Sequence, residues 1–290
     1  DIDDAMKLGF NWQRGPFEMI DAIGHDRMAE LFAEAGVETP AVLTEGGEFY
    51  RAEGRTLEVR HAGGGYHPVS LPEGVMRFHM TRRTLTPITA NNSASLFALE
   101  GDLRLVEFHS KANALTDESM EIVAAAAADH GKGIIIHNDA QHFSAGVDLN
   151  AFRAYIEAED WDGIDGFLDR FQKAVCALKY TPVPVVGAPS GLAAGGGYEV
   201  LAHCDRLVVH TNSVMGLVEA GVGVVPGGGG IKDTFFRWHA AKDSWDEAAW
   251  QTWMNIGYGA TGSSPQLSAR MMYFRDGHDE TCLLYTSDAA

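Results

Sequence analysis

The sequence is poor in basic side chains and in cysteine. Its 22 lysines and arginines face 40 acidic residues, so the formal net charge is −18, and no block of basic residues interrupts the chain. This composition argues against a nucleic-acid-binding protein. The three cysteines, Cys176, Cys204 and Cys282, show no CxxC spacing, which argues against a disulfide framework and against a zinc site. We expect reduced thiols in a cytoplasmic protein.

A long hydrophobic run is also missing. The longest one, IVAAAAA at 122–128, is far shorter than the ~20 residues that a membrane-spanning helix requires, and the N-terminus does not have the pattern of a signal peptide. The chain starts at DIDDAMKLGF without methionine, and we therefore expect a fragment of a longer protein. Its 46% hydrophobic content is sufficient for a substantial core.

Several catalytic signatures are absent. There is no HExxH, no GxSxG and no GxGxxG after a strand, and PGGGGIKD does not have the spacing of a phosphate-binding loop. The 12 histidines show no metal-ligand pattern, and we interpret His137 and His142, near the glycine turns described below, as structural or exposed. The sequence thus predicts neither a metal site nor a nucleotide fingerprint.

The pattern of hydrophobic residues divides the chain into three regions. Apolar residues recur at helical spacing over 1–36, which ends at Gly36 as a C-cap. From 39 to 94, strand-like pieces alternate with glycine turns, which predicts a connector with a hairpin. From 95 onward strands and helices alternate, which predicts a layered α/β domain with crossovers.

The third region contains several local signals. Gly101 and Asp102 predict a hairpin turn between two strands, and Thr116 predicts the N-cap of a helix. Helical spacing over 161–180 predicts a long helix that ends before two prolines. Short apolar runs predict further strands at 133–138, 183–190 and 206–210.

Three glycine-bearing turns, at 141–149, 190–201 and 215–230, follow one another in this region. The first two lie where a strand gives way to a helix, a junction that leaves N–H donors unpaired. The peptide N–H groups of Val147 and Gly196 are therefore candidate donors to an oxyanion. Alternatively, the glycines of GGGYE only permit close packing, and Asp148 only caps the next helix.

Two glutamates accompany these turns. Glu199 is expected in the first turn of a helix, near the candidate donors and in contact with solvent. Glu219 is the only charged residue between 215 and 225, where desolvation would raise its pKa. Two carboxyls in such different environments are typical of a general acid and a general base. The alternative is a pair of solvated surface charges.

FSAGVDL, SGLAAGGGYEVLAHCDRLV and MGLVEAGVGVVPGGGG, in this order and spacing, closely resemble the enoyl-CoA hydratase/isomerase (crotonase) superfamily over about residues 95–278. The resemblance implies an α/β fold, the ββα spiral of the crotonase domain. It places the oxyanion hole at the N–H groups of Val147 and Gly196 and the catalytic carboxylates at Glu199 and Glu219. It also implies contacts with the substrate or coenzyme A for Lys111 and Ala112 in SKANAL, and for Ala145, Gly146, Asp148 and Gly195.

The N-terminal stretch DIDDAMKLGFNWQRGPFEMIDAIG is similar to the end of the helical C-terminal domain of 3-hydroxyacyl-CoA dehydrogenases. The order of the two parts resembles a bacterial β-oxidation fusion protein. We expect a dehydrogenase remnant at 1–38, a connector at 39–94 and a hydratase domain without its closing helices at 95–278. We expect a non-native tail at 279–290. Its last ten residues, TCLLYTSDAA, resemble translated sequencing adapter, and we expect no fold for them.

The resemblance implies hydration of a trans-2-enoyl-CoA to a 3-hydroxyacyl-CoA in fatty-acid β-oxidation. Acyl-CoA is then the substrate and the hydratase part needs no cofactor, whereas NAD is expected only for the missing dehydrogenase part. A second copy of the chain or a thiolase is a candidate partner of the full-length protein. The alternatives are a Δ3,Δ2-enoyl-CoA isomerase and a non-catalytic acyl-CoA-binding fragment.

Overall fold

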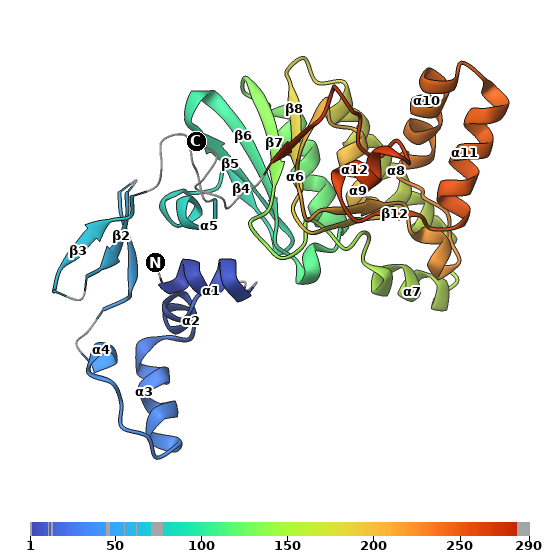
Figure 1. The fold of residues 1–290 in the computed structure, drawn as a ribbon. Coiled ribbons are helices and arrows are strands. Elements are labelled where there is room, and N and C mark those ends of the chain that lie inside the picture. Colours follow the sequence, from blue (N-terminus) through green and yellow to red (C-terminus); the bar gives the residue numbers. More distant parts are fainter. Residues whose placement is uncertain are drawn as a thin grey trace. The chain divides into compact units, whose positions relative to one another are not determined.

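A computed structural model of the chain describes residues 2–10, 12, 14–44, 47–54, 56–61, 63–70 and 78–282. Packing divides the described residues into two compact units, with the boundary between Thr86 and Pro87 (Figure 1). This division differs from the predicted one, because most of the predicted connector belongs to the first unit. No helix in the described part of the chain combines the length and the hydrophobicity of a membrane span.

The first unit consists of short helices and an antiparallel sheet. Its helices are α1 (Ile2–Phe10), α2 (Pro16–Ile23), α3 (His25–Glu34), α4 (Ala41–Thr44) and α5 (Phe78–Thr81), followed by a single turn, η1 (Arg82–Thr84), and its sheet has the order β1 (Tyr50–Glu53), β2 (Thr56–Arg60), β3 (Tyr66–Pro68). Leu43, Phe49 and Leu57 of the predicted connector form a core with Phe17 and Ile20. The stretch is therefore part of a folded unit and not a linker.

Buried carboxylates organise the helices of this unit. The Asp3 side chain accepts hydrogen bonds from the N–H groups of Phe17, at 2.8 Å, and Glu18, at 3.1 Å, in the first turn of α2. The Tyr50 hydroxyl donates to the same carboxylate at 2.9 Å. Asp3 thus ties α1 to the start of α2 and to β1. As predicted, α3 is followed by Gly36 in the left-handed conformation, with φ of 67°.

The second unit is built on a mixed seven-stranded sheet. Its order is β13 (Glu280–Cys282), β10 (Arg206–His210), β8 (Val185–Ala188), β7 (Gly133–His137), β6 (Leu103–Phe108), β5 (Ala94–Leu99), β4 (Thr89–Ala90). β4, β5 and β6 are antiparallel neighbours, whereas the pairs from β6 to β13 are all parallel. This is the α/β architecture with crossovers that the alternation of strands and helices predicted.

A second, small sheet lies beside the glycine turns. It has the order β12 (Thr261–Gly262), β11 (Val214–Gly216), β9 (Leu192–Ala194). β9 and β11 pair in parallel, so the residues that follow each strand leave the sheet at the same edge. The second and third glycine turns therefore start side by side.

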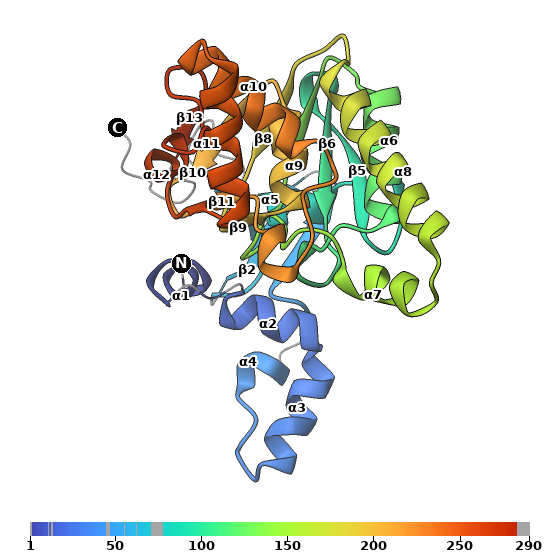
Figure 2. The same cartoon turned by 90° about the vertical axis from the view of Figure 1, so that its right-hand side faces the viewer.

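The helices of this unit pack in pairs. They are α6 (Asp117–Ala128), α7 (Leu149–Glu157), α8 (Trp161–Lys179), α9 (Gly196–Ala202), α10 (Gly230–Lys242), α11 (Trp245–Gly257) and α12 (Pro265–Ala269), with single turns η2 (Glu100–Asp102), η3 (Lys111–Asn113) and η4 (Glu219–Val222). α6 runs along α8 and α10 along α11 (Figure 2). α9 is buried along its whole length.

Local predictions in this unit are confirmed. The Thr116 side chain accepts a hydrogen bond from Ser119 N and caps α6. Gly101 and Asp102, both with positive φ, lie in the turn between the antiparallel strands β5 and β6. α8 occupies the predicted helix and begins after Asp160, whose side chain accepts from Gly163 N. Each of these features depends on residues close in sequence.

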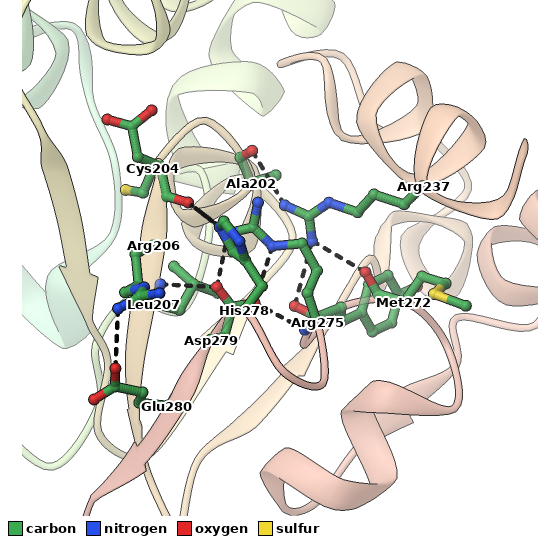
Figure 3. A network of polar contacts seen from close by, with 12 residues as sticks. Ala202, Cys204, Arg206, Leu207, Arg237, Met272, Arg275, His278, Asp279 and Glu280 are labelled. Atoms are coloured by element: carbon green, nitrogen blue, oxygen red, sulfur yellow. Dashed lines mark hydrogen bonds and ion pairs between the residues drawn. The ribbon is translucent and has the colours of Figure 1, made fainter. Parts of the chain in front are cut away.

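The segment 272–280 docks through a dense polar network (Figure 3). The Asp279 carboxylate accepts hydrogen bonds from Leu207 N at 3.0 Å and from the guanidinium and the N–H of Arg275. Arg237 donates to the carbonyl oxygens of Ala202 and Met272. The expected non-native tail is therefore folded at its start, where β13 (Glu280–Cys282) extends the sheet, and the expectation of no fold from 281 onward is wrong for 281 and 282. The remaining residues, 283–290, lie outside the described part.

Asp279→Ala should destabilise the second unit strongly. The substitution leaves the buried Leu207 N–H without an acceptor and removes the countercharge of Arg275, a change that typically costs about 2–5 kcal/mol. The control is Glu280→Gln, because the neighbouring Glu280 pairs with Arg206 at 3.0 Å in solvent and contributes within about 1 kcal/mol. Urea unfolding monitored by circular dichroism measures both. Equal midpoints for the two variants would contradict the structural role of Asp279.

Candidate active site

The three glycine turns meet at the edge of the small sheet. Ala194 N donates to Ser144 O at 3.1 Å, which joins the second turn to the first. Gly195 N donates to Gly216 O at 2.8 Å, which joins the second turn to the strand that leads into the third. Sequence positions far apart thus converge on Gly195.

The two candidate oxyanion donors lie next to each other. Gly146 and Gly196 approach so closely that a Cβ on Gly146 would lie 3.6 Å from Gly196 N, and a Cβ on Gly196 would lie 2.9 Å from Val147 Cγ2. In the described part of the chain, neither Val147 N nor Gly196 N donates a hydrogen bond. Both peptide groups are therefore free to donate to a ligand oxygen.

Glu199 lies in the first turn of α9 and is buried, with 2% of its surface exposed. Its Oε1 accepts hydrogen bonds from Gly228 N at 2.8 Å and Gly230 N at 2.9 Å. The expectation that this side chain contacts solvent is wrong, because the third glycine turn folds over it. A side chain on residue 228 would fill the same space, since a Cβ there would lie 2.6 Å from Glu199 Oε2.

The environment of Glu199 shifts its proton affinity. Burial raises the pKa of the carboxyl to about 7, and the negative charges of Glu219 and Asp233 act in the same direction. The N–H groups of Gly228 and Gly230 oppose this shift because they stabilise the ionised form. Glu199 can therefore change its protonation state near neutral pH.

Glu219 begins the short turn η4 and is half-buried. Burial raises its pKa, as the apolar sequence around it predicted, and the N–H groups of Glu219 and Val218 oppose the shift. Its Oε2 is buried and has no hydrogen-bond partner among the residues that the structure describes. A Cβ on Gly195 would lie 3.0 Å from Glu219 Oε1, so this carboxylate adjoins the second glycine turn. Both carboxyls thus have raised pKa values, and the predicted contrast between them is absent.

The other predicted site residues surround the first turn. Lys111, Ala112 and Ala145 are exposed, and Ala145 N donates to Ala112 O at 3.2 Å. Gly146 is buried and its carbonyl accepts from Leu115 N at 2.8 Å, so the 111–115 segment runs beside the turn. These contacts place the residues together, while their role toward a substrate stays a prediction.

Asp148 has the structural role that was considered as an alternative. Its carboxylate accepts from Asn150 N at 2.9 Å and caps α7. The cap occupies one carboxylate oxygen at the start of the helix, where a negative charge is favoured. A contact between Asp148 and a substrate remains untested.

The sequence did not reveal the groups that hold Glu199. The sequence marks PGGGG as a glycine turn, but only the fold shows that two of its N–H groups bind the Glu199 carboxylate. His203 and Asp233, both buried, were also missed. A cavity of about 510 Å³ borders the same turn and is lined by Gln172, Cys176, His203, Pro226, Gly227, Gly228, Gly229, Ile231, Lys232, Phe235 and Phe236.

No metal centre is predicted by the sequence, and the described residues contain no group of three or more histidine, cysteine or acidic side chains arranged to hold an ion.

The raised pKa of Glu199 predicts a stability that falls as pH rises. The folded state holds a proton on Glu199 up to pH ~7, whereas the unfolded chain releases it near pH 4.5, so unfolding becomes easier across this window. The difference amounts to roughly 3 kcal/mol. Glu199→Gln, which keeps the shape but cannot ionise, should lose this contribution. Urea midpoints at pH 5 and pH 8 test this, and identical pH dependence of the two proteins would contradict it.

Comparisons with known proteins agree with this architecture. Residues 103–238 match the model of the enoyl-CoA hydratase/isomerase family, and residues 1–53 match that of the 3-hydroxyacyl-CoA dehydrogenase C-terminal domain. A solved enoyl-CoA hydratase from Bacillus anthracis superposes with a TM-score of 0.55 at 18% identity, over 67% of this chain and 71% of that one. One from Polaromonas sp. JS666 has a TM-score of 0.55 at 19% identity, over 65% and 70%. These two superpositions show the fold.

Curated relatives are similar to this chain over different shares of its length. A "Probable 3-hydroxyacyl-CoA dehydrogenase" of Bacillus subtilis is 33% identical over 285 residues, which cover 95% of this chain and 36% of the relative. A "Fatty acid oxidation complex subunit alpha" of Idiomarina loihiensis is 33% identical over 102 residues, 35% of this chain and 14% of the relative. The chain thus spans about a third or less of these proteins. It carries a domain of the enoyl-CoA hydratase/isomerase (crotonase) family, preceded by a segment of the 3-hydroxyacyl-CoA dehydrogenase C-terminal domain family.

Proposed function

We propose that the second unit hydrates a trans-2-enoyl-CoA to a 3-hydroxyacyl-CoA. The observation that carries this proposal is the placement of two carboxyls with raised pKa values, Glu199 and Glu219, next to the turn at Gly195. Hydration adds a hydroxyl to one carbon and a proton to its neighbour, so it benefits from two acid–base groups. The unpaired N–H groups are those of Gly196, in this turn, and of Val147, in the neighbouring first turn.

The thioester carbonyl oxygen would accept hydrogen bonds from Val147 N and Gly196 N. As the hydroxyl adds at the β-carbon, the electron pair of the double bond moves toward this oxygen and forms an enolate. Two fixed N–H donors stabilise that charge without having to reorient, and the loss of one such donor typically costs about 10²–10³ in rate. The polarised carbonyl is what makes the β-carbon electrophilic.

Each of the two carboxyls would carry out one of the two proton transfers. Glu199, held at Oε1 by two N–H groups and ionised above about pH 7, takes a proton from water as the oxygen attacks the β-carbon. Glu219, whose pKa burial raises, delivers a proton to the α-carbon and quenches the enolate. Addition would be syn if both carboxyls act on the same face of the substrate. The Glu199 proton then returns to Glu219 or to solvent.

The larger protein would combine this reaction with the next one. The Bacillus subtilis relative is named "Probable 3-hydroxyacyl-CoA dehydrogenase", and residues 1–53 of the first unit match the C-terminal domain of that enzyme class. A dehydrogenase oxidises the 3-hydroxyacyl-CoA that hydration produces. NAD would serve that step only, and hydration consumes only the thioester and water.

Glu199→Gln and Glu219→Gln should each lower kcat/KM for crotonyl-CoA by about 10²–10⁴, because each removes one proton transfer and preserves the shape of the site. The control is Glu121→Gln on the exposed side of α6. The loss of the thioester's conjugated absorbance measures hydration in the full chain. Near-parental rates in both site variants would refute the assignment.

The Δ3,Δ2-enoyl-CoA isomerase is the second candidate, because moving a double bond needs only one acid–base group. A 3-enoyl-CoA substrate separates the two activities. Under the hydratase proposal, 2-enoyl-CoA is the better substrate and both glutamates are required. Preferential turnover of the 3-enoyl-CoA, with one of the two glutamine variants still active, would favour the isomerase.

A further inference from the structure

His203 is hydrogen-bonded to the main chain of Glu199. Its Nδ1 lies 2.7 Å from Glu199 O, and because a carbonyl oxygen only accepts, Nδ1 carries the proton. His203 is 1% exposed and follows the last turn of α9. The contact therefore fixes the peptide from which the Glu199 side chain projects.

The other face of the imidazole meets α10. His203 Nε2 lies 3.2 Å from Asp233 Oδ2, and this contact becomes an ion pair only when the imidazole carries a second proton, on Nε2. Asp233 lies one turn after Gly230, whose N–H binds the Glu199 carboxylate. Lys179, at the end of α8, pairs with Asp233 Oδ1, and Lys232 Nζ lies 3.6 Å from Oδ2. The cluster thus brings together the ends of α8 and α9 and the first turn of α10.

We infer that His203 and Asp233 are positioning residues for Glu199. His203 holds the main chain of Glu199, and Asp233 lies against the imidazole on α10, whose first N–H group, that of Gly230, binds the carboxylate. The imidazole therefore lies between the main chain of Glu199 and the helix α10 that begins at Gly230. This inference rests on the proposed function of Glu199 as the base.

Two physical effects follow from this arrangement. The first is geometric, since a displacement of about 1 Å in a reacting group can cost on the order of 100-fold in rate. The second is electrostatic. The negative charge of Asp233 raises the pKa of Glu199, and its field is partly offset by Lys179 and Lys232. Burial lowers the pKa of His203, while the Glu199 carbonyl and Asp233 oppose that shift.

The cavity of about 510 Å³ borders this cluster, and it allows the effect of removing the His203 side chain to be predicted. His203, Lys232 and the turn Gly227–Gly229 line it. Truncation of the imidazole would extend this cavity toward the Glu199 peptide and admit water. The carboxylate would then become better hydrated and its pKa would fall.

The kinetic test compares His203→Ala with His203→Gln, whose amide can donate to the same carbonyl. We expect His203→Ala to lower kcat for crotonyl-CoA by about 10- to 100-fold with KM within about twofold, and His203→Gln to recover most of kcat. The control is His278→Ala. The His278 imidazole also donates a hydrogen bond to a carbonyl oxygen, Asp205 O at 2.7 Å, but this side chain is exposed (Figure 3). In a Glu199→Gln background, His203→Ala should cost little more.

A measurement that needs no turnover distinguishes failure of this inference from failure of the proposed function. Carbon-13 labelling of glutamate carboxyls gives the pKa of Glu199 by NMR titration, with the resonance assigned from its absence in Glu199→Gln. We expect a value near 7 that falls in His203→Ala and in Asp233→Asn, the latter because a negative charge is lost.

The outcomes separate the two ideas. If the full chain does not hydrate crotonyl-CoA but the pKa of Glu199 falls in both variants, the proposed reaction fails and the positioning role stands. If the pKa of Glu199 is the same in wild type, His203→Ala and Asp233→Asn, the positioning role is refuted. It is also refuted if His203→Ala and His203→Gln reduce kcat no more than His278→Ala does, with all variants folded by circular dichroism.

Discussion

The site depends on two hydrogen bonds to one buried oxygen, from Gly228 N and Gly230 N to Glu199 Oε1. A carboxylate removed from water without such donors would stay protonated, and a carboxylate in water would have an ordinary pKa. The N–H groups of Gly228, just before α10, and of Gly230, its first residue, partly offset the effect of burial. The pKa of Glu199 is therefore about 7. They also require glycine, because a side chain at 228 would enter the space of the carboxylate and of Phe171.

Much of the second unit follows from residues near one another in sequence. The cap at Thr116, the turn at Gly101 and the spacing of α8 are local, and the structure contains all three. The environment of Glu199 is different, because its partners lie 29 and 31 positions later in the chain. No window around Glu199 contains that information, so a first-turn glutamate was expected in solvent. Glu219 was predicted better because its own neighbours are apolar.

Short strands were the second feature that could not be predicted from the sequence. β9, β11 and β13 have three residues each, too few to show an alternating pattern, yet β9 and β11 bring the glycine turns together. In the first unit, too, the sequence pattern around a strand did not show its packing partners. Its strands were interpreted as a connector because Phe49 and Leu57 find their partners on α2 and not in adjacent sequence. In both cases tertiary packing supplies what local pattern does not.

The parallel pairing of β13 with β10 has a consequence beyond the stability of one domain. Without β13, β10 would be the last strand of the large sheet and would present unpaired N–H and C=O groups to solvent. Such an edge is a template for strand addition by another molecule. Two of the three β13 residues are polar, Glu280 and Thr281, and the strand is short. It thereby gives the sheet a boundary that discourages edge-to-edge association between chains.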